Sequence, residues 1–510
     1  MAAMHLPVSL ITNKEHLPWI VQKFGGTSIG KFLENIANNI VKPYLELRRV
    51  ALVCSARSGE SKAKGTTNRL LEASKEALKK DSKKYVRIVN EICQEHVKAS
   101  QEIIMNKEIL KELEKQLIHD CLLLKNFLDA AQIIEEISPR SQDIIIGFGE
   151  RLSCRIITAV LQDKGIDAEF VNLDNIIDQR FDENNLNQKF YDYLAKRITD
   201  VVSKCENRVP VITGYFGLVP GGLLNSIGRG YTDLCAALLA VGLGAKELQV
   251  WKEVDGIFTA DPRKVCNARL LPIITPEEAS ELTYYGSEVI HPFTMEQVIR
   301  ANIPIRIKNV NNPNGKGTII FPDINEISKV PFRKGFSYGS RCVSTLLNEN
   351  GYHDDMSRRH PTAVTIKNNI IVLNIHSNRK TISHGFFAQI FVALDTYGII
   401  VDLISTSEVH VSMALGVEGD LDKALNELRK LGTVDILKDM AILSLVGKQM
   451  KNMVGIAGRM FSTLAAANVN IEMISQGASE INISCVIDER NSDKALNVIH
   501  EHLLSNLPSL

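Results

Sequence analysis

The sequence predicts an α/β fold with a mostly parallel sheet in residues 19–325, followed by two copies of a smaller α/β unit. Short apolar segments alternate with helical patterns through the first part of the chain, which is typical of a sheet covered by helices on both faces. A glycine-rich turn follows the first apolar segment, and a repeat occupies the C-terminal part. These three observations together favour a ligand-binding sheet joined to a duplicated module.

Composition excludes several classes of function. Of the 510 residues, 45% are hydrophobic and 23% are charged, and the 59 basic side chains equal the 59 acidic ones. A neutral chain has no overall attraction for nucleic acid, and no apolar run is long enough for a membrane span, so we expect neither partner. The nine cysteines include no C-x-x-C pair, so we expect reduced thiols, no metal site and a cytoplasmic location.

The catalytic unit is expected to span residues 19–325, with an inserted helical subdomain at about 68–140. That insertion is rich in Lys, Glu, Leu and Ile and almost free of Gly and Pro. A polar linker at 326–362 and repeats at 363–438 and 439–510 complete the chain. Strands are expected at 19–21, 50–53, 144–146, 209–213, 247–251 and 304–307.

The first turn has the composition of a phosphate cradle. It reads Lys23-Phe24-Gly25-Gly26-Thr27-Ser28. Two glycines let backbone N–H groups approach a phosphate, Thr27 and Ser28 offer hydroxyls at the start of a helix, and Lys23 adds a positive charge. The spacing is neither a Walker A loop nor a dinucleotide fingerprint. A tight turn without a ligand remains an alternative.

Two further clusters carry groups suited to an amino acid. Glu150 is expected just after the strand at 144–146, where its carboxylate would meet an ammonium group, although an ion pair with Arg151 would also explain it. Arg229 lies between two glycines and offers a fork for a carboxylate. Asp233 follows at the start of an Ala-rich helix, where a simple N-cap is the alternative role.

A turn-rich loop closes the strand at 247–251. It runs from Trp251 to Arg263 and contains the turn signals Asp255-Gly256 and Asp261-Pro262. A loop at the carboxyl edge of the sheet is placed to wrap a nucleotide base. Hydroxyl groups near Ser55 and Thr67 would lie near the first turn.

The C-terminal repeat keeps a constant offset of 70 residues. Gly385 aligns with Gly455, and Val401 aligns with Ile471. Each copy reads as strand, helix, strand, strand, helix, and such copies bury their open faces on each other and leave a pocket at the junction. A module that only dimerises is the alternative.

Together these motifs resemble aspartate kinase, of the amino-acid kinase fold with paired ferredoxin-like ACT regulatory domains. The resemblance rests on the first turn, Gly228-Arg229-Gly230, residues 254–257 with 259–263, and His291-Pro292. It covers nearly the whole chain and is closest to the fungal type. The chain departs from bacterial members at Tyr231-Thr232 and at Glu288, which puts a nucleotide contact from Glu288 in doubt.

The resemblance implies a role for each matching position. Lys23 and Asp233 are the implied catalytic pair. The other implied residues are Thr67, Glu150, Arg229 and Thr232 for aspartate; Lys23, Gly25, Gly26, Ser28, Ser55, Lys252, Glu253, Phe258, Arg263 and Val289 for ATP; and Ser383, Gly385, Phe386, Phe387, Val401, Asp402 and Ser407 for an amino-acid effector.

The implied reaction is phosphorylation of the β-carboxylate of L-aspartate by ATP with Mg²⁺, the first step toward threonine and methionine. The resemblance implies feedback by threonine more than by lysine, and a dimer or tetramer formed through the ACT domains. Two alternatives remain. One is a kinase acting on glutamate or N-acetylglutamate, and the other is a non-catalytic amino-acid sensor, which should lack Lys23, Arg229 or Asp233.

Overall fold

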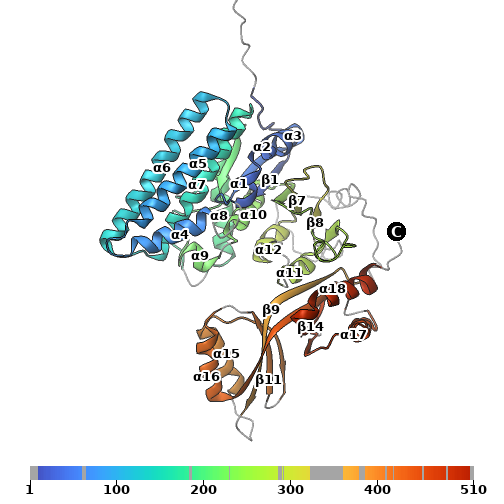
Figure 1. Cartoon of the computed structure of the whole chain (residues 1–510). Helices are drawn as coiled ribbons and strands as arrows, with labels where there is room; N and C mark the ends of the chain where they lie inside the picture. Colours follow the sequence, from blue (N-terminus) through green and yellow to red (C-terminus); the bar gives the residue numbers. More distant parts are fainter. Residues whose placement is uncertain are drawn as a thin grey trace, which may run out of the picture. The chain divides into compact units, whose positions relative to one another are not determined.

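The structure is a computed structural model of the 510-residue chain. It describes residues 10–59, 65–182, 186–228, 230–284, 290, 292–321, 360–377, 385–407, 410–416, 419–448, 450, 453–477 and 481–505. The chain forms two compact units (Figure 1). One comprises residues 1–256 and 290–351, and the other comprises residues 257–289 and 352–510. In the described part of the chain, no helix is both long and apolar enough to span a bilayer.

A parallel sheet forms the centre of the first unit. In spatial order its strands are β3 (Ala168–Val171), β4 (Val209–Thr213), β2 (Arg49–Cys54), β1 (Trp19–Phe24), β5 (Glu247–Lys252), β7 (Ile305–Asn309) and β8 (Thr318–Ile320). All neighbours run parallel except β8, which is antiparallel to β7. The strands are almost wholly buried, which explains their uniformly apolar sequence. The predicted mostly parallel α/β sheet is confirmed.

Short and medium helices cover this sheet. They are α1 (Gly26–Lys31), α2 (Leu33–Asn35), η1 (Ile36–Val41), α3 (Lys42–Leu47), α8 (Gln188–Val202), η3 (Ser203–Cys205), α9 (Leu223–Ser226), α10 (Tyr231–Leu243) and α12 (Pro292–Arg300). The Ala-rich α10 packs closely against α8. A Cβ added at Gly242 would meet Thr199 Oγ1 at 2.0 Å, so only glycine permits this contact.

The predicted helical insertion is present. It consists of α4 (Thr66–Ala77), α5 (Lys84–Ile103), α6 (Lys107–Ile134) and the first part of α7 (Pro139–Asp163), which lie side by side in Figure 1. The expected strand at 144–146 is wrong, because these residues lie inside α7. Ser138 caps that helix and Pro139 occupies its first turn. A short apolar run fits a buried helix as well as a strand, and periodicity alone does not separate them.

The second unit contains the two predicted repeats. The first is β9 (Ala363–Ser377), α15 (Phe386–Thr396), β10 (Val401–Thr406), β11 (His410–Gly416) and α16 (Leu421–Leu431). The second is β12 (Gly432–Val446), α17 (Ile456–Ala466), β13 (Met473–Ser475), β14 (Asn482–Asp488), η5 (Glu489–Asn491), α18 (Ser492–His500) and η6 (Glu501–Ser505). Both have the predicted order of strands and helices, and they form one antiparallel sheet in the order β10-β11-β9-β12-β14-β13.

The repeats share a core. Each repeat buries one face of its strands under its own two helices. A further buried cluster joins residues from both repeats, namely Ile370, Val372, Leu403, Ala414, Met440, Ile442, Met473 and Val486. The open faces of the two copies therefore pack on each other, as the duplication predicted.

A segment that precedes both repeats in sequence is built into this second unit. It runs through β6 (Ile273–Ile274) to α11 (Pro276–Tyr284). The Thr259 hydroxyl is hydrogen bonded to His500 Nε2 at 2.8 Å, and its carbonyl accepts from the Val364 N–H at 2.8 Å. Ala260 and Val265 belong to the core of the second repeat. The segment that follows the turn at Gly256 is thus held by the C-terminal unit.

Candidate active site

Strand β1 ends at a glycine turn whose two glycines have different roles. A Cβ added at Gly26 would meet the Ala56 carbonyl oxygen at 2.2 Å, so no side chain fits there. A Cβ at Gly25 would meet nothing within 4 Å, so the turn is open on that side. Helix α1 begins at Gly26, with Gly25 as its N-cap, rather than at Thr27 and Ser28. The turn combines close backbone packing with an open face.

Lys23 and Asp233 form an ion pair beside this turn. Lys23 Nζ lies 2.8 Å from Asp233 Oδ1, and Lys23 is 9% exposed. Lys23 comes from β1, whereas Asp233 lies in the first turn of α10, whose N-cap is Gly230. The N-cap role considered for Asp233 is therefore wrong. Its carboxylate instead forms a charge-assisted contact with the Lys23 amine and orients it. Both side chains are only partly open to solvent.

Glu150 lies fully buried in α7 next to the same α10 turn. Its carboxylate accepts hydrogen bonds from the Thr232 hydroxyl, at 2.8 Å, and from the Tyr215 N–H. Burial raises the pKa of Glu150 to about 7, while hydrogen bonds from Thr232 and Tyr215 and the charge of Lys23 act in the opposite direction. A buried carboxylate within the field of Lys23 is a suitable partner for a ligand's ammonium group.

The alternative ion pair between Glu150 and Arg151 does not form. Arg151 is paired with Asp174 and lies 3.5 Å from Asp120 Oδ1. Its guanidinium also lies over the Phe148 ring, 4.7 Å from the centroid. Successive helical residues point in different directions, so Arg151 faces away from Glu150.

Helix α7 also anchors the loop that leads toward α10. Asp143 is 2% exposed and lies seven residues, about two turns, before Glu150 on the same helix. Its carboxylate accepts from the N–H groups of Leu223 and Leu224 at the start of α9. One helix therefore holds both Glu150 and the chain that leads to Thr232.

The predicted residues Ser55 and Thr67 lie close to these groups. The Ser55 N–H donates to the Phe24 carbonyl at 3.1 Å, and Thr67 occupies the first turn of α4. A Cβ added at Gly149 would touch Ala56 at 3.0 Å and Thr66 at 3.3 Å, so this turn of α7 packs tightly on the start of α4. The structure brings Ser55 beside the glycine turn and Thr67 beside the helix that carries Glu150.

The loop after β5 approaches the glycine turn from the neighbouring strand. Trp251 pairs with Phe24 in the sheet, so Lys252 follows next to the end of β1. The Ser28 hydroxyl donates to Glu253 Oε1 at 3.5 Å. Lys252 and Glu253 thus lie near the turn, whereas Phe258 and Arg263 belong to the second unit, where Arg263 is exposed and paired with Asp261.

Three predicted site residues, Arg229, Val289 and Ser383, lie outside the described residues, as does Glu288. Sequence reasoning missed Tyr215, whose N–H holds Glu150. Tyr215 follows the end of β4, and its position at a strand's carboxyl end was the available signal.

The predicted effector residues gather around the start of α15 and the strand β10. Gly385 caps α15 with φ 89°, a conformation that favours glycine, and it is followed by buried Phe386 and exposed Phe387. Val401 and Asp402 begin β10, and the Ser407 N–H donates to the His410 carbonyl at 2.8 Å.

Asp402 has a partner that the sequence did not reveal. The Asp402 side chain is 2% exposed, and its Oδ1 lies 2.7 Å from Lys367 Nζ. Its Oδ2 is buried and has no hydrogen-bond partner among the described residues. Lys367 is a charged residue in β9 after an apolar stretch, but nothing in the local sequence pairs it with Asp402. One oxygen of Asp402 is therefore free to accept a ligand's donor.

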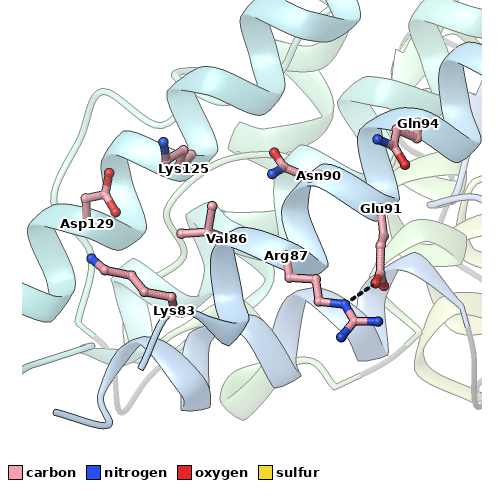
Figure 2. Close-up of a pocket in the computed structure, with 8 residues that line it drawn as sticks. All are labelled: Lys83, Val86, Arg87, Asn90, Glu91, Gln94, Lys125 and Asp129. Carbon is pink, nitrogen blue, oxygen red and sulfur yellow. Dashed lines mark hydrogen bonds and ion pairs between the residues drawn. The ribbon is translucent and has the colours of Figure 1, made fainter. Parts of the chain in front are cut away.

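A separate hollow of about 650 Å³ lies in the helical insertion (Figure 2). It is lined by Lys83, Val86, Arg87, Asn90, Glu91 and Gln94 of α5 and its approach, and by Lys125 and Asp129 of α6. Its charges are mixed, and Arg87 is already paired with Glu91 at 2.8 Å. None of the predicted site residues lines it.

The residues of the described ranges include no group of three His, Cys, Asp or Glu side chains that could hold a metal ion. Near the glycine turn, the carboxylate of Asp233 is engaged by Lys23.

Comparison with known proteins gives two family matches. Residues 18–309 match the amino acid kinase family, and residues 443–503 match the ACT domain family. An aspartokinase from Schizosaccharomyces pombe is 57% identical over 506 residues, covering 98% of this chain and 96% of that protein. An aspartokinase from Saccharomyces cerevisiae is 52% identical over 513 residues, covering 98% and 95%.

Solved structures show the same fold. Aspartokinase III of Escherichia coli in complex with lysine and aspartate matches with a TM-score of 0.71 at 24% identity, covering 95% of this chain and 99% of that one. Aspartate kinase from Clostridium acetobutylicum matches with a TM-score of 0.68 at 24% identity, covering 94% and 99%.

Proposed function

The chain belongs to the amino acid kinase family and, within it, to the aspartokinases, and we propose that it transfers the γ-phosphoryl group of ATP to the β-carboxylate of L-aspartate. The products are 4-phospho-L-aspartate and ADP. The observation that carries the proposal is the meeting of two pairs at the carboxyl edge of the sheet. In the first pair, Asp233 holds the positively charged amine of Lys23 in place. In the second pair, the buried carboxylate of Glu150 accepts a hydrogen bond from Thr232 and could accept another from a ligand.

The reaction needs no general base. A β-carboxylate has an ordinary pKa near 4, so it is already ionised and nucleophilic at neutral pH. The difficulty is that an anion must approach an anionic phosphate. Catalysis is therefore positioning together with charge neutralisation.

Lys23 supplies that neutralisation. Its ammonium group is held by Asp233, and Lys23 lies two residues before Gly25, whose open side we propose as the place where the γ-phosphate meets the attacking carboxylate. Asp233 would act on Lys23, because its carboxylate pairs with the Lys23 amine and would hold that amine in one place. The backbone N–H of Gly26 and the hydroxyl of Ser28 would donate hydrogen bonds to the phosphates. Ser55, Lys252 and Glu253 would lie on either side of them.

Glu150 would bind the α-ammonium group of aspartate, with Thr232 and Thr67 as hydroxyl partners. Arg229 would take the α-carboxylate through its two-pronged guanidinium. The buried position of Glu150 makes its negative charge costly until a cation arrives, so aspartate binding would relieve that cost.

Mg²⁺ would enter as part of the nucleotide substrate. Bound with the nucleotide, the ion would lower the negative charge that the aspartate carboxylate must approach.

We propose that the paired repeats bind threonine and reduce activity, and that Phe258, Arg263 and Val289 complete the nucleotide site. Support comes from the free oxygen of Asp402, which suits an effector's ammonium group. We also propose a homo-oligomer formed through the repeats, and a cytoplasmic enzyme of threonine and methionine synthesis. The free state of the eight described cysteines is consistent with that location.

The decisive experiment is an ADP-release assay on the full chain with a panel of acceptors. Aspartate should support turnover, whereas glutamate and N-acetylglutamate should not. Threonine and lysine are then titrated separately against the aspartate reaction. Turnover with glutamate alone would favour the longer-acceptor kinase, and no turnover with any acceptor, together with threonine binding, would favour the sensor.

A further inference from the structure

A polar turn follows β7 and connects two parts of the proposed nucleotide site. It comprises residues 309–312, hereafter the asparagine turn. The Asn309 carbonyl accepts from the Asn312 N–H at 3.1 Å, and the Asn309 side chain accepts from the Asn311 N–H at 2.9 Å. These local bonds give the turn a fixed shape without help from a ligand.

One side of the asparagine turn holds the loop after β5. Asp255 Oδ1 accepts hydrogen bonds from both Asn309 Nδ2, at 3.2 Å, and Asn312 Nδ2, at 3.1 Å. The Val310 N–H donates to the Lys252 carbonyl at 2.8 Å. Three bonds thus fasten the four-residue stretch from Lys252 to Asp255 at both of its ends.

The other side of the asparagine turn holds the chain that follows the glycine turn. Asn35 at the end of α2 donates a side-chain hydrogen bond to the Val310 carbonyl. Helix α2 comes directly after α1, which begins at Gly26. Val310 is fully buried, so its N–H and carbonyl connect these two segments inside the protein rather than through solvent.

We infer that Asn309 and Asn312 are positioning residues for ATP, acting through Asp255 to hold the loop at Lys252 and Glu253 at a fixed spacing from the glycine turn. The inference rests on the proposed kinase function, in which the nucleotide lies between that loop and that turn. A loop held in place before binding loses less entropy when the ligand arrives, so the bonds to Asp255 favour nucleotide affinity.

This role differs from that of the groups that meet aspartate. Neither asparagine is bonded to Glu150, Thr232, Lys23 or Asp233 in the hydrogen bonds and ion pairs of the described residues. Loss of the hydrogen bonds to Asp255 should therefore change only the KM for ATP and the affinity for ADP. That selectivity separates a positioning role from general damage to the fold.

The test uses the full chain and an Asn312→Asp variant, which places a second carboxylate against Asp255. We expect the KM for ATP to rise about tenfold or more, because a charged hydrogen bond becomes a repulsion. The KM for aspartate and kcat at saturating ATP should each stay within about twofold. ADP binding measured by calorimetry should weaken in parallel with the KM for ATP.

A double variant, Asn312→Asp with Asp255→Asn, exchanges donor and acceptor at this contact. It should lower the KM for ATP at least about threefold relative to Asn312→Asp, because the repulsion between two carboxylates is gone; recovery stays partial because Asn309 Nδ2 also donates to Asp255 and loses that carboxylate. Asn314→Ala is the matched control. Asn314 is an exposed asparagine close to the turn with no side-chain bond to any described residue, and its replacement should leave all three constants unchanged.

The outcomes separate two failures. If the starting enzyme phosphorylates aspartate but Asn312→Asp has an unchanged KM for ATP, the inference is overturned and the proposed function stands. If the variant instead raises both KM values equally, or the double variant gives no recovery, the turn is merely structural and the inference also fails. If the starting enzyme is inactive yet binds ADP, the proposed function fails, and the ADP affinities of the variants still decide the role of the turn.

Discussion

The amine of Lys23 lies 2.8 Å from the carboxylate of Asp233, although the two residues come from a strand and a helix more than two hundred positions apart in the chain. The pair places a held positive charge near the carboxyl end of β1, which continues into the turn at Gly25 and Gly26. This arrangement gives the proposed reaction its electrostatic centre.

Replacing Lys23 tests that centre. Lys23→Met should reduce kcat at least ~100-fold, because one preorganised charge is lost from the transition state. The matched control is Lys31→Met, which removes an exposed lysine from the last turn of α1 and should change kcat by less than about twofold. Steady-state ADP release measures both, with thermal unfolding as a check on folding. Near-normal turnover of Lys23→Met would contradict the assignment.

Aspartate binding should strengthen between pH 6 and pH 8. The pKa of Glu150 is raised to about 7 by burial, so its carboxylate is about one-tenth ionised at pH 6 and about nine-tenths ionised at pH 8. Only the ionised form attracts the ammonium group, so the affinity should rise about tenfold. Calorimetry without nucleotide avoids the titration of ATP. A Glu150→Gln variant should bind weakly with no such dependence, and a flat profile in the starting enzyme would refute the role.

A buried lysine gives a stability prediction. Lys308 is 7% exposed and lies over the Trp251 ring, 5.1 Å from its centroid, and burial lowers its pKa from 10.5 to about 8. The unfolded chain therefore binds more protons between pH 8 and 10.5, and stability should rise with pH in that window. Below pH 8, Lys308 is charged in the folded protein as well, so the full free-energy cost of burying that charge lowers the stability.

The variant Lys308→Met removes that cost. It should stabilise the protein by about 1–2 kcal/mol at pH 7, with the gain disappearing above pH 10.5. Denaturant unfolding at both pH values measures the difference. Lys316→Met, at an exposed position nearby, should show neither effect. A variant that is less stable at pH 7 would mean that the contacts of Lys308 with Trp251 and Tyr44 outweigh its desolvation.

Asp402 should control the response to the effector. Asp402→Asn removes the charge that the effector's ammonium group would meet, so half-inhibition by threonine should need at least about tenfold more threonine. The control is Asp420→Asn, an exposed carboxylate paired with Lys423 in the same repeat. Activity is followed across a threonine titration for each protein. An unshifted curve for Asp402→Asn would place the effector elsewhere.

The contact between Thr259 and His500 should contribute to stability. The Thr259 hydroxyl is bonded to His500 and also accepts from the Arg269 N–H at 2.9 Å, and both Thr259 and His500 are buried. Thr259→Val should cost about 1–3 kcal/mol, because the buried His500 ring nitrogen and the part-buried Arg269 N–H lose their partner. The control Thr463→Val removes an exposed helical hydroxyl. Equal unfolding temperatures for the two variants would contradict this estimate.

Much of the site could be predicted because it follows strand ends. Lys23, Gly25 and Gly26 come directly after an apolar strand, and sequence order alone places them at the edge of the sheet. The strand expected before Glu150 was wrong because a three-residue apolar run is equally compatible with the buried helix α7. The partnership of Lys367 with Asp402 depends on packing between strands, which no local pattern reports.

Residues 257–284 belong to the second unit, and they contribute core side chains to it although they precede both repeats in the sequence. A protein cut at the linker would strip Ala260 and Val265 of the apolar surroundings they have in the intact chain. The C-terminal half, as the chain is folded, is therefore not independent of residues 257–284. Removing the repeats by truncation should therefore yield an aggregating fragment with exposed apolar side chains, and point substitutions such as Asp402→Asn are the sounder way to test the proposed regulation.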